Sequence, residues 1–284
     1  MDYKLLNLKV NGDERGKLIS LEGGKSVPFE IKRVYWIFDT LPDSDRGFHA
    51  HKSLEQIIVA MDGACEFVLD DGVSREKVLL NRPDVGLYIG KNMWREMRHF
   101  SYGCKLMVLA SEYYDEGEYI REYAEFKANL SANGNSQNQN LVKNSVDFTS
   151  AAKNEGFALA DIAGGGGQLN ALKLPFTPSR VFYIFDTKGD VVRGNHANKE
   201  SQFVMFCVKG SCKVRVDDGV RKSEVVLSAQ NGTPQNALWL DKMIWKEMFD
   251  FSHDAVLVVL ASTLYDESEY IRDYEAFAQS RGAL

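Results

Sequence analysis

The chain of 284 residues carries the same sequence twice, and this duplication restricts its possible folds more than any other feature. RVYWIFDT at 33–40 returns as RVFYIFDT at 180–187, and RGFHAHK at 46–52 returns as RGNHANK at 193–199. The segment LASEYYDEGEYIREYAEF, from Leu109, returns as LASTLYDESEYIRDYEAF, from Leu260. The sequence therefore predicts one fold formed twice, as a tandem duplication.

A polar segment separates the two copies. ANLSANGNSQNQNLVKNS is rich in Asn, Ser and Gln and poor in apolar residues, as linkers are. We expect a catalytic domain at 1–130, a linker at 131–150 and a second, degenerate domain at 151–284.

Composition excludes several classes of protein. A net charge of -6 with no basic run argues against nucleic acid as a partner. No apolar stretch has the length of a signal peptide core or a membrane span, so we expect a cytoplasmic protein without membrane association. The four cysteines lie in or beside apolar runs and are expected to be buried and reduced.

Each copy consists of short β-rich runs between Gly, Asp and Pro breaks, such as EQIIVAM, CEFVLD and VGLYIG in the first. Many short strands of this kind predict an antiparallel sandwich or barrel. The exception is the acidic end of each copy, YDEGEYIREYAEFKANL and YDESEYIRDYEAFAQ, whose apolar spacing predicts a helix docked on the barrel. The predicted class is all-β, with a short helix ending each domain.

The most reactive segment is RGFHAHKSLEQ at 46–56, where His49 and His51 stand one residue apart. In a strand, alternate side chains share a face, so both imidazoles would point the same way. If they point inward, they form a paired acid/base site or a metal site. If they point outward, they are two solvated polar residues at a strand entrance.

The metal alternative rests on His49, His51 and Glu55, whose H-x-H-x3-E spacing resembles the first metal-binding motif of the cupin superfamily. That motif normally joins a later histidine, but RPDVGLYIGKNMWREM has none, and His99 lies further along the chain. Two-histidine, one-carboxylate iron sites exist, so the alternative stays open. We favour a site with no metal and no cofactor.

Taken together, KRVYWIFD, RGFHAHKSLEQ, MWREM and the LASEYYDEGEYIREYAEF ending resemble the WxcM-like and FdtA-like sugar 3,4-ketoisomerases of the cupin superfamily. The resemblance covers about the first 126 residues strongly and the remainder as a divergent copy. It implies two double-stranded β-helix (jelly-roll) barrels and conversion of dTDP-4-keto-6-deoxyglucose to a dTDP-3-keto-6-deoxyhexose. The product would serve deoxyamino-sugar and lipopolysaccharide biosynthesis. Single-domain relatives resemble dimers that exchange amino-terminal strands; here the halves are expected to pair as a pseudo-dimer, with a further homodimer possible.

The reaction needs a base near neutrality, which histidine supplies. We assign His51 as the proton shuttle, His49 as the group that orients it or protonates the enediolate, and Tyr35 as a hydrogen-bond donor to the migrating oxygen. The candidate substrate-binding residues are Arg33, Arg46, Lys52, Trp94 and Arg121. For Arg121 an ion pair with neighbouring glutamates, and for Trp94 simple packing, are the structural alternatives.

The second copy replaces His51 by Asn198 and Tyr35 by Phe182. It keeps the other candidate residues Arg33, Arg46, His49, Lys52 and Arg121, as Arg180, Arg193, His196, Lys199 and Arg272. Neither replacement can transfer a proton near pH 7, so we expect the second domain to have lost catalysis. Three other functions stay open: a metal-dependent cupin enzyme, a nucleotide-sugar 3,5-epimerase and a sugar-binding module.

Overall fold

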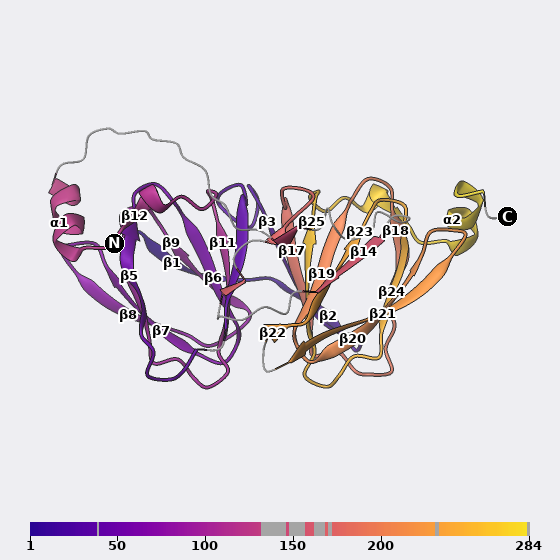
Figure 1. Ribbon diagram of the computed structural model, residues 1–284, viewed down its shortest axis with the longest axis horizontal. Coiled ribbons are helices and arrows are strands. Elements are labelled where there is room, and N and C mark those ends of the chain that lie inside the picture. Colours follow the sequence, from indigo (N-terminus) through magenta and orange to yellow (C-terminus); the bar gives the residue numbers. More distant parts are fainter. Residues whose placement is uncertain are drawn as a thin grey trace. The chain divides into compact units, whose positions relative to one another are not determined.

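The computed structural model describes residues 1–38, 40–131, 146–147, 157–161, 168–169, 172–230 and 233–282. These residues form β-sheets, antiparallel except for one two-stranded parallel sheet, and two short α-helices, α1 (Tyr123–Ser131) and α2 (Tyr274–Ser280). The predicted all-β class, with two cupin-type jelly-roll barrels that each end in a short helix, is confirmed (Figure 1).

The chain divides into two compact units that are not continuous in sequence. Unit 1 contains residues 1–8, the described residues from 29 to 131, and 168–169. Unit 2 contains residues 9–28 and the remaining described residues from 146 onward. The continuous domains expected from the sequence stay a prediction, and most of the expected linker lies outside the described residues.

Two sheets build unit 1 (Figure 1). The first runs in the order β1 (Tyr3–Asn7), β9 (Val85–Ile89), β6 (Gln56–Asp62), β11 (Lys105–Ala110), β4 (Arg33–Ile37) and β15 (Gln168–Leu169). The second runs β12 (Tyr119–Ile120), β5 (Arg46–His51), β10 (Trp94–Arg98), β7 (Cys65–Asp70) and β8 (Arg75–Leu80). A buried cluster that includes Ile58, Phe67, Leu106 and Val108 forms the core of this unit.

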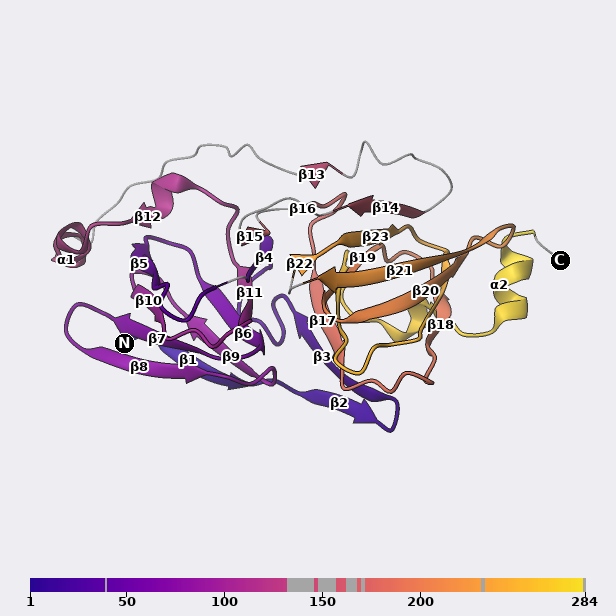
Figure 2. The same cartoon turned by 60° about the horizontal axis from the view of Figure 1, so that its bottom comes forward.

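Unit 2 repeats the plan with strands from both ends of the sequence (Figure 2). Its first sheet runs β14 (Phe157–Asp161), β23 (Asn236–Leu240), β19 (Phe203–Lys209), β25 (Val256–Ala261), β17 (Arg180–Phe185), β3 (Gly16–Glu22) and β2 (Val10–Asp13). Its second runs β22 (Thr233–Pro234), β21 (Lys222–Gln230), β20 (Ser211–Asp217), β24 (Trp245–Phe249), β18 (Arg193–Asn198) and β26 (Tyr270–Ile271). A two-stranded sheet of β13 (Val146–Asp147) and β16 (Leu172–Lys173) completes it.

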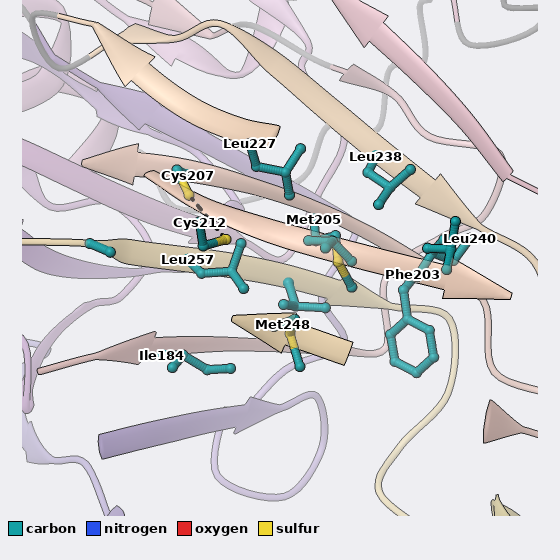
Figure 3. Close-up of a cluster of buried hydrophobic side chains, with 14 of the residues drawn as sticks. Ile184, Phe203, Met205, Cys207, Cys212, Leu227, Leu238, Leu240, Met248 and Leu257 are labelled. Atoms are coloured by element: carbon teal, nitrogen blue, oxygen red, sulfur yellow. Dashed lines mark hydrogen bonds between the residues drawn. The ribbon is translucent and has the colours of Figure 1, made fainter. Parts of the chain in front are cut away.

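The unit 2 core fills the space between these sheets with alternate, inward-facing side chains (Figure 3). Met205 and Leu257 come from the first sheet, and Met248 comes from the second. Cys207 and Cys212 also lie in this core, with sulfur atoms 3.7 Å apart and no disulfide. All four cysteines are buried and free, as the sequence predicts.

The acidic ending of each copy is only partly helical, which corrects the longer helix expected from its spacing. In the first copy, Asp115 accepts from Gly117 N and begins a 3-10 turn at Glu116–Glu118, and Tyr119–Ile120 then form β12. Only after that does α1 begin. Pairing of β12 with β5 prevails over the local helical pattern, because it gives hydrogen-bond partners to backbone N–H and C=O groups of both strands.

Among the described residues, no helix is long and apolar enough to cross a membrane.

Candidate active site

A β-bulge in β5 directs both histidines of the H-x-H segment. His49 pairs with Arg95 of β10 while Gly47 pairs with Glu96, so Phe48 is an extra residue on its strand. Gly47 and Phe48 have φ values of 89° and 52°. A Cβ on Gly47 would lie 2.8 Å from the Arg95 carbonyl oxygen, so glycine is required here.

Past the bulge, the two imidazoles lie against each other inside unit 1. Their ring centroids are 4.8 Å apart, and the His51 side chain is completely buried. The predicted inward orientation is therefore correct for His51, and His49 is partly buried beside it.

A hydrogen-bonded chain of three side chains forms the floor of the site. Gln56 Nε2, on β6, donates to the hydroxyl of Tyr35, on β4, at 2.8 Å. Arg95 Nη1, on β10, donates to Gln56 Oε1 at 3.0 Å. This chain links the two sheets of unit 1 and leaves the Tyr35 hydroxyl hydrogen available for another acceptor. Sequence reasoning assigned no role to Gln56.

Arg33, on the same strand as Tyr35, lies against two tyrosine rings at the site. Its guanidinium lies 4.8 Å from the centre of the Tyr35 ring and 5.4 Å from that of Tyr114. Both distances are typical of cation–π contacts.

Tyr119 forms a wall that the sequence did not reveal. Because β12 pairs with β5, its ring lies 4.3 Å from His51 and 5.0 Å from His49, measured between centroids. Arg121 lies 4.6 Å above the Tyr119 ring and forms an ion pair with Glu116 at 2.8 Å. The ion pair weighed for Arg121 is therefore present, at an exposed position beside the site.

Electrostatics keep both histidines neutral at pH 7. Burial, followed by the charge of Arg95, lowers the pKa of His49 to about 3 and holds the pKa of His51 well below its usual range. Burial raises the pKa of Tyr35 to about 12, so its hydroxyl stays protonated. Burial lowers the pKa of Arg95 only to about 10, which leaves it a cation.

Several buried polar atoms here have no hydrogen-bond partner among the described residues. They include Nδ1 and Nε2 of His51, Nε and Nη2 of Arg33, and Nε and Nη2 of Arg95. Buried donors and acceptors in folded proteins are nearly always satisfied, so such a concentration indicates a site for a polar ligand.

Three predicted substrate-binding residues lie elsewhere in unit 1. Trp94 is buried against Tyr123 and Phe126 under α1, and strand alternation sends it away from its neighbour Arg95. Lys52 donates to the Gly117 carbonyl oxygen at 2.7 Å. Arg46 is half-buried at the start of β5. Their roles in substrate binding stay predictions.

The donor set for a metal does not assemble within the described part of the chain. No group of three or more His, Cys, Asp or Glu side chains lies close enough to share an ion. Glu55 instead accepts a hydrogen bond from Tyr88 at 2.6 Å, and His99 is exposed beside Glu66. The described residues do not fit the cupin metal motif.

Two comparisons relate this site to known proteins. The family model described as "FdtA: WxcM-like, C-terminal" matches residues 1–131 and again 160–282. A TDP-4-oxo-6-deoxy-alpha-D-glucose-3,4-oxoisomerase from Aneurinibacillus thermoaerophilus is 52% identical over 127 residues, which is 45% of this chain and 91% of the relative.

Solved structures give matches of the same extent. A 3,4-ketoisomerase from Helicobacter canadensis is 60% identical, with a TM-score of 0.46, and covers 46% of this chain and 98% of its own. The WlaRB TDP-quinovose 3,4-ketoisomerase from Campylobacter jejuni is 62% identical, with a TM-score of 0.45, and covers 45% and 98%. With both copies matched by its model, the chain belongs to the FdtA, WxcM-like C-terminal family.

Proposed function

We propose that unit 1 is a nucleotide-sugar 3,4-ketoisomerase that converts dTDP-4-keto-6-deoxyglucose to a dTDP-3-keto-6-deoxyhexose. The observation that carries the proposal is a neutral, fully buried His51 beside Arg95, which is bonded through Gln56 to a protonated Tyr35. The 52% identical relative bears the name of an oxoisomerase for this sugar.

The reaction moves two protons and needs no oxidant. His51 removes the proton on C3, and the electron pair of that bond forms a C3=C4 double bond while the C4 carbonyl oxygen becomes an enediolate. The C3 hydroxyl then passes its proton to the C4 enediolate oxygen, which becomes the C4 hydroxyl, and the C3 oxygen becomes the new carbonyl. C4 receives a proton from the imidazolium, which restores neutral His51.

Tyr35 stabilises the enediolate oxygen by donating its free hydroxyl hydrogen. Arg95 and Arg33 supply fixed positive charge in a site shielded from water. These cations depress the imidazole pKa in the free protein, and the negative charge of the bound enediolate offsets them. His51 therefore becomes a stronger base when the negative charge develops.

The proposal also includes the binding of the diphosphate and the biosynthetic role of the product. The diphosphate would contact cationic side chains, with Arg121 beside the site and Arg46 at the start of β5 as candidates. The family resemblance supports a cytoplasmic role in deoxyamino-sugar and lipopolysaccharide biosynthesis.

The direct test is incubation of the chelator-treated chain with dTDP-4-keto-6-deoxyglucose in deuterated buffer, followed by proton NMR. We expect a 3-keto sugar with deuterium entering at the ring carbons. An unchanged sugar until a divalent metal is restored would favour the metal-dependent cupin enzyme instead. Inversion at C3 or C5 without migration of the carbonyl would favour the epimerase.

A further inference from the structure

The interior of unit 2 has different residues from the unit 1 site at four equivalent positions. Phe182, Asn198, Phe203 and Lys246 stand where Tyr35, His51, Gln56 and Arg95 stand in unit 1. These replacements remove the whole hydrogen-bonded floor, the proposed proton shuttle His51 and the proposed oxyanion donor Tyr35.

A different polar pair takes its place. Lys246 Nζ, on β24, donates to Asn198 Oδ1, on β18, at 2.6 Å. The same ammonium lies 4.6 Å from the centre of the Phe203 ring. Lys246 is only 4% exposed, and burial, followed by the charge of Arg180, lowers its pKa to about 7.

One member of this pair and one buried side chain near it have polar atoms with no partner among the described residues. Asn198 Nδ2 is one, and Nε of Arg180 is the other, in side chains that are 1% and 3% exposed. Arg180 lies 5.3 Å from the ring of Phe182. Burial, followed by the charge of Lys246 and smaller contributions from Arg272 and Arg180, lowers the pKa of His196 to about 3. These unsatisfied donors point to a polar ligand.

The rim of this interior repeats the contacts seen in unit 1. It consists of Gly194, Asn195, His196, Tyr270 and Arg272. Gly194 and Asn195 repeat the bulge with φ values of 92° and 54°, which places His196 4.7 Å from the ring of Tyr270. Arg272 lies 4.7 Å over that ring and pairs with Glu267, as Arg121 does with Glu116. The entrance is thus preserved while the floor is rebuilt.

We infer that unit 2 holds a second binding site for a nucleoside diphosphate-linked 6-deoxy sugar, which it retains without isomerising. The ligand class rests on the function proposed for unit 1, because the shared rim would meet the same nucleotide and diphosphate. Lys246 and Asn198 supply donors for sugar oxygens, and Phe182 and Phe203 offer apolar rings to the C–H face and methyl group of the sugar.

The test measures binding stoichiometry by equilibrium dialysis, using the full chain carrying His51→Asn to prevent turnover in unit 1. With dTDP-4-keto-6-deoxyglucose as the probe, we expect two molecules bound per chain. Adding Lys246→Met should weaken one of the two sites at least tenfold and leave the other unchanged. With dTDP as the probe, the same substitution should have a smaller effect, because Lys246 faces the sugar.

Lys213→Met is the matched control, since Lys213 is an exposed lysine in unit 2 paired with Asp250 at 2.9 Å. It should leave both sites intact. If Lys246→Met fails to fold, the stoichiometry of the His51→Asn chain alone decides.

One molecule per chain, or equal binding with and without Lys246, would overturn the inference. This result is distinct from failure of the proposed isomerase. A chain that isomerises the sugar but binds one molecule refutes only the second site, whereas a chain that binds two molecules without isomerising either refutes only the proposed reaction.

Discussion

At His51, one environment sets both the chemistry and the stability of the site. Burial and nearby arginines favour the neutral imidazole, which can accept a proton from C3. The unfolded chain imposes no such preference, because a solvated histidine has its ordinary pKa of about 6.5. The native site therefore carries a cost that depends on pH.

This difference predicts acid sensitivity. The folded pKa lies below the unfolded pKa, so the unfolded state binds more protons and stability falls as the pH drops below about 6.5. By pH 5, His51 alone should cost about 2 kcal/mol of the free energy of unfolding. Urea denaturation at pH 7 and pH 5 should show that His51→Asn removes this part of the loss. His99→Asn, at an exposed histidine, should keep the wild-type difference, and equal losses in all three proteins would contradict the pKa assignment.

Tyr35→Phe copies the residue of unit 2 and removes one hydroxyl. We expect the rate of isomerisation to fall roughly 10²- to 10³-fold, as for loss of an oxyanion donor, with little change in affinity for dTDP. Single-turnover kinetics together with dTDP titration separate the two effects. An unchanged rate with weakened binding would make Tyr35 a binding residue only.

The positions of the two histidines were predictable from the sequence, but their surroundings were only partly so. His49, His51 and Tyr35 follow from the strand pattern, the resemblance and the comparison of the two copies. Tyr119 was not predictable, because its segment reads locally as helix and reaches the histidines only through pairing with β5. Gln56 looks like an ordinary polar residue at a strand start until the facing strands bring it to Tyr35 and Arg95.

Among the elements, β5 depends on its bulge. Without the extra residue at Phe48, strand alternation would reverse, and the histidines would leave the interior. The sequence shows RGFHAHK as a simple alternating strand, so neither the bulge nor its positive φ values were predictable from spacing.

Gly47→Ala tests the bulge. Alanine would meet the Arg95 carbonyl and adopt an unfavourable φ, so we expect a loss of about 1–3 kcal/mol of stability. The same substitution should also reduce isomerisation through displaced histidines. Gly103→Ala is the matched control in unit 1, since Gly103 also has positive φ (72°) but nothing within 4 Å of the added Cβ. Thermal denaturation and activity assays measure both, and equal activity of the two variants would contradict the role of the bulge.

At the scale of the whole molecule, the duplication is evident in the sequence but the distribution of strands is not. Residues 9–28 precede the first copy of the repeat, yet β3 pairs along β17 in unit 2, with Ile19 opposite Tyr183. The residues of a strand do not show which distant strand it pairs with, because the same alternating pattern suits more than one partner.

Because β3 belongs to unit 2, a mutation near the amino terminus should act in unit 2. Ile19 is fully buried in unit 2, so Ile19→Ala should cost about 2–5 kcal/mol. Hydrogen exchange should speed up in β17 and β25 but not in β4 and β11. Ile58→Ala, in the core of unit 1, is the reciprocal control. Faster exchange confined to unit 1 in Ile19→Ala would contradict this assignment of the strands.

If His51 carries the proton between two carbons of the sugar, replacing it must slow the entry of deuterium from the solvent into the ring. Wild type, His51→Asn and His99→Asn would each be followed by NMR with dTDP-4-keto-6-deoxyglucose in deuterated buffer. We predict that His51→Asn slows both isomerisation and deuterium entry by roughly 10²- to 10⁴-fold while still binding dTDP, and that His99→Asn matches wild type. If His51→Asn exchanges and isomerises within a few-fold of wild type, His51 is not the proton carrier.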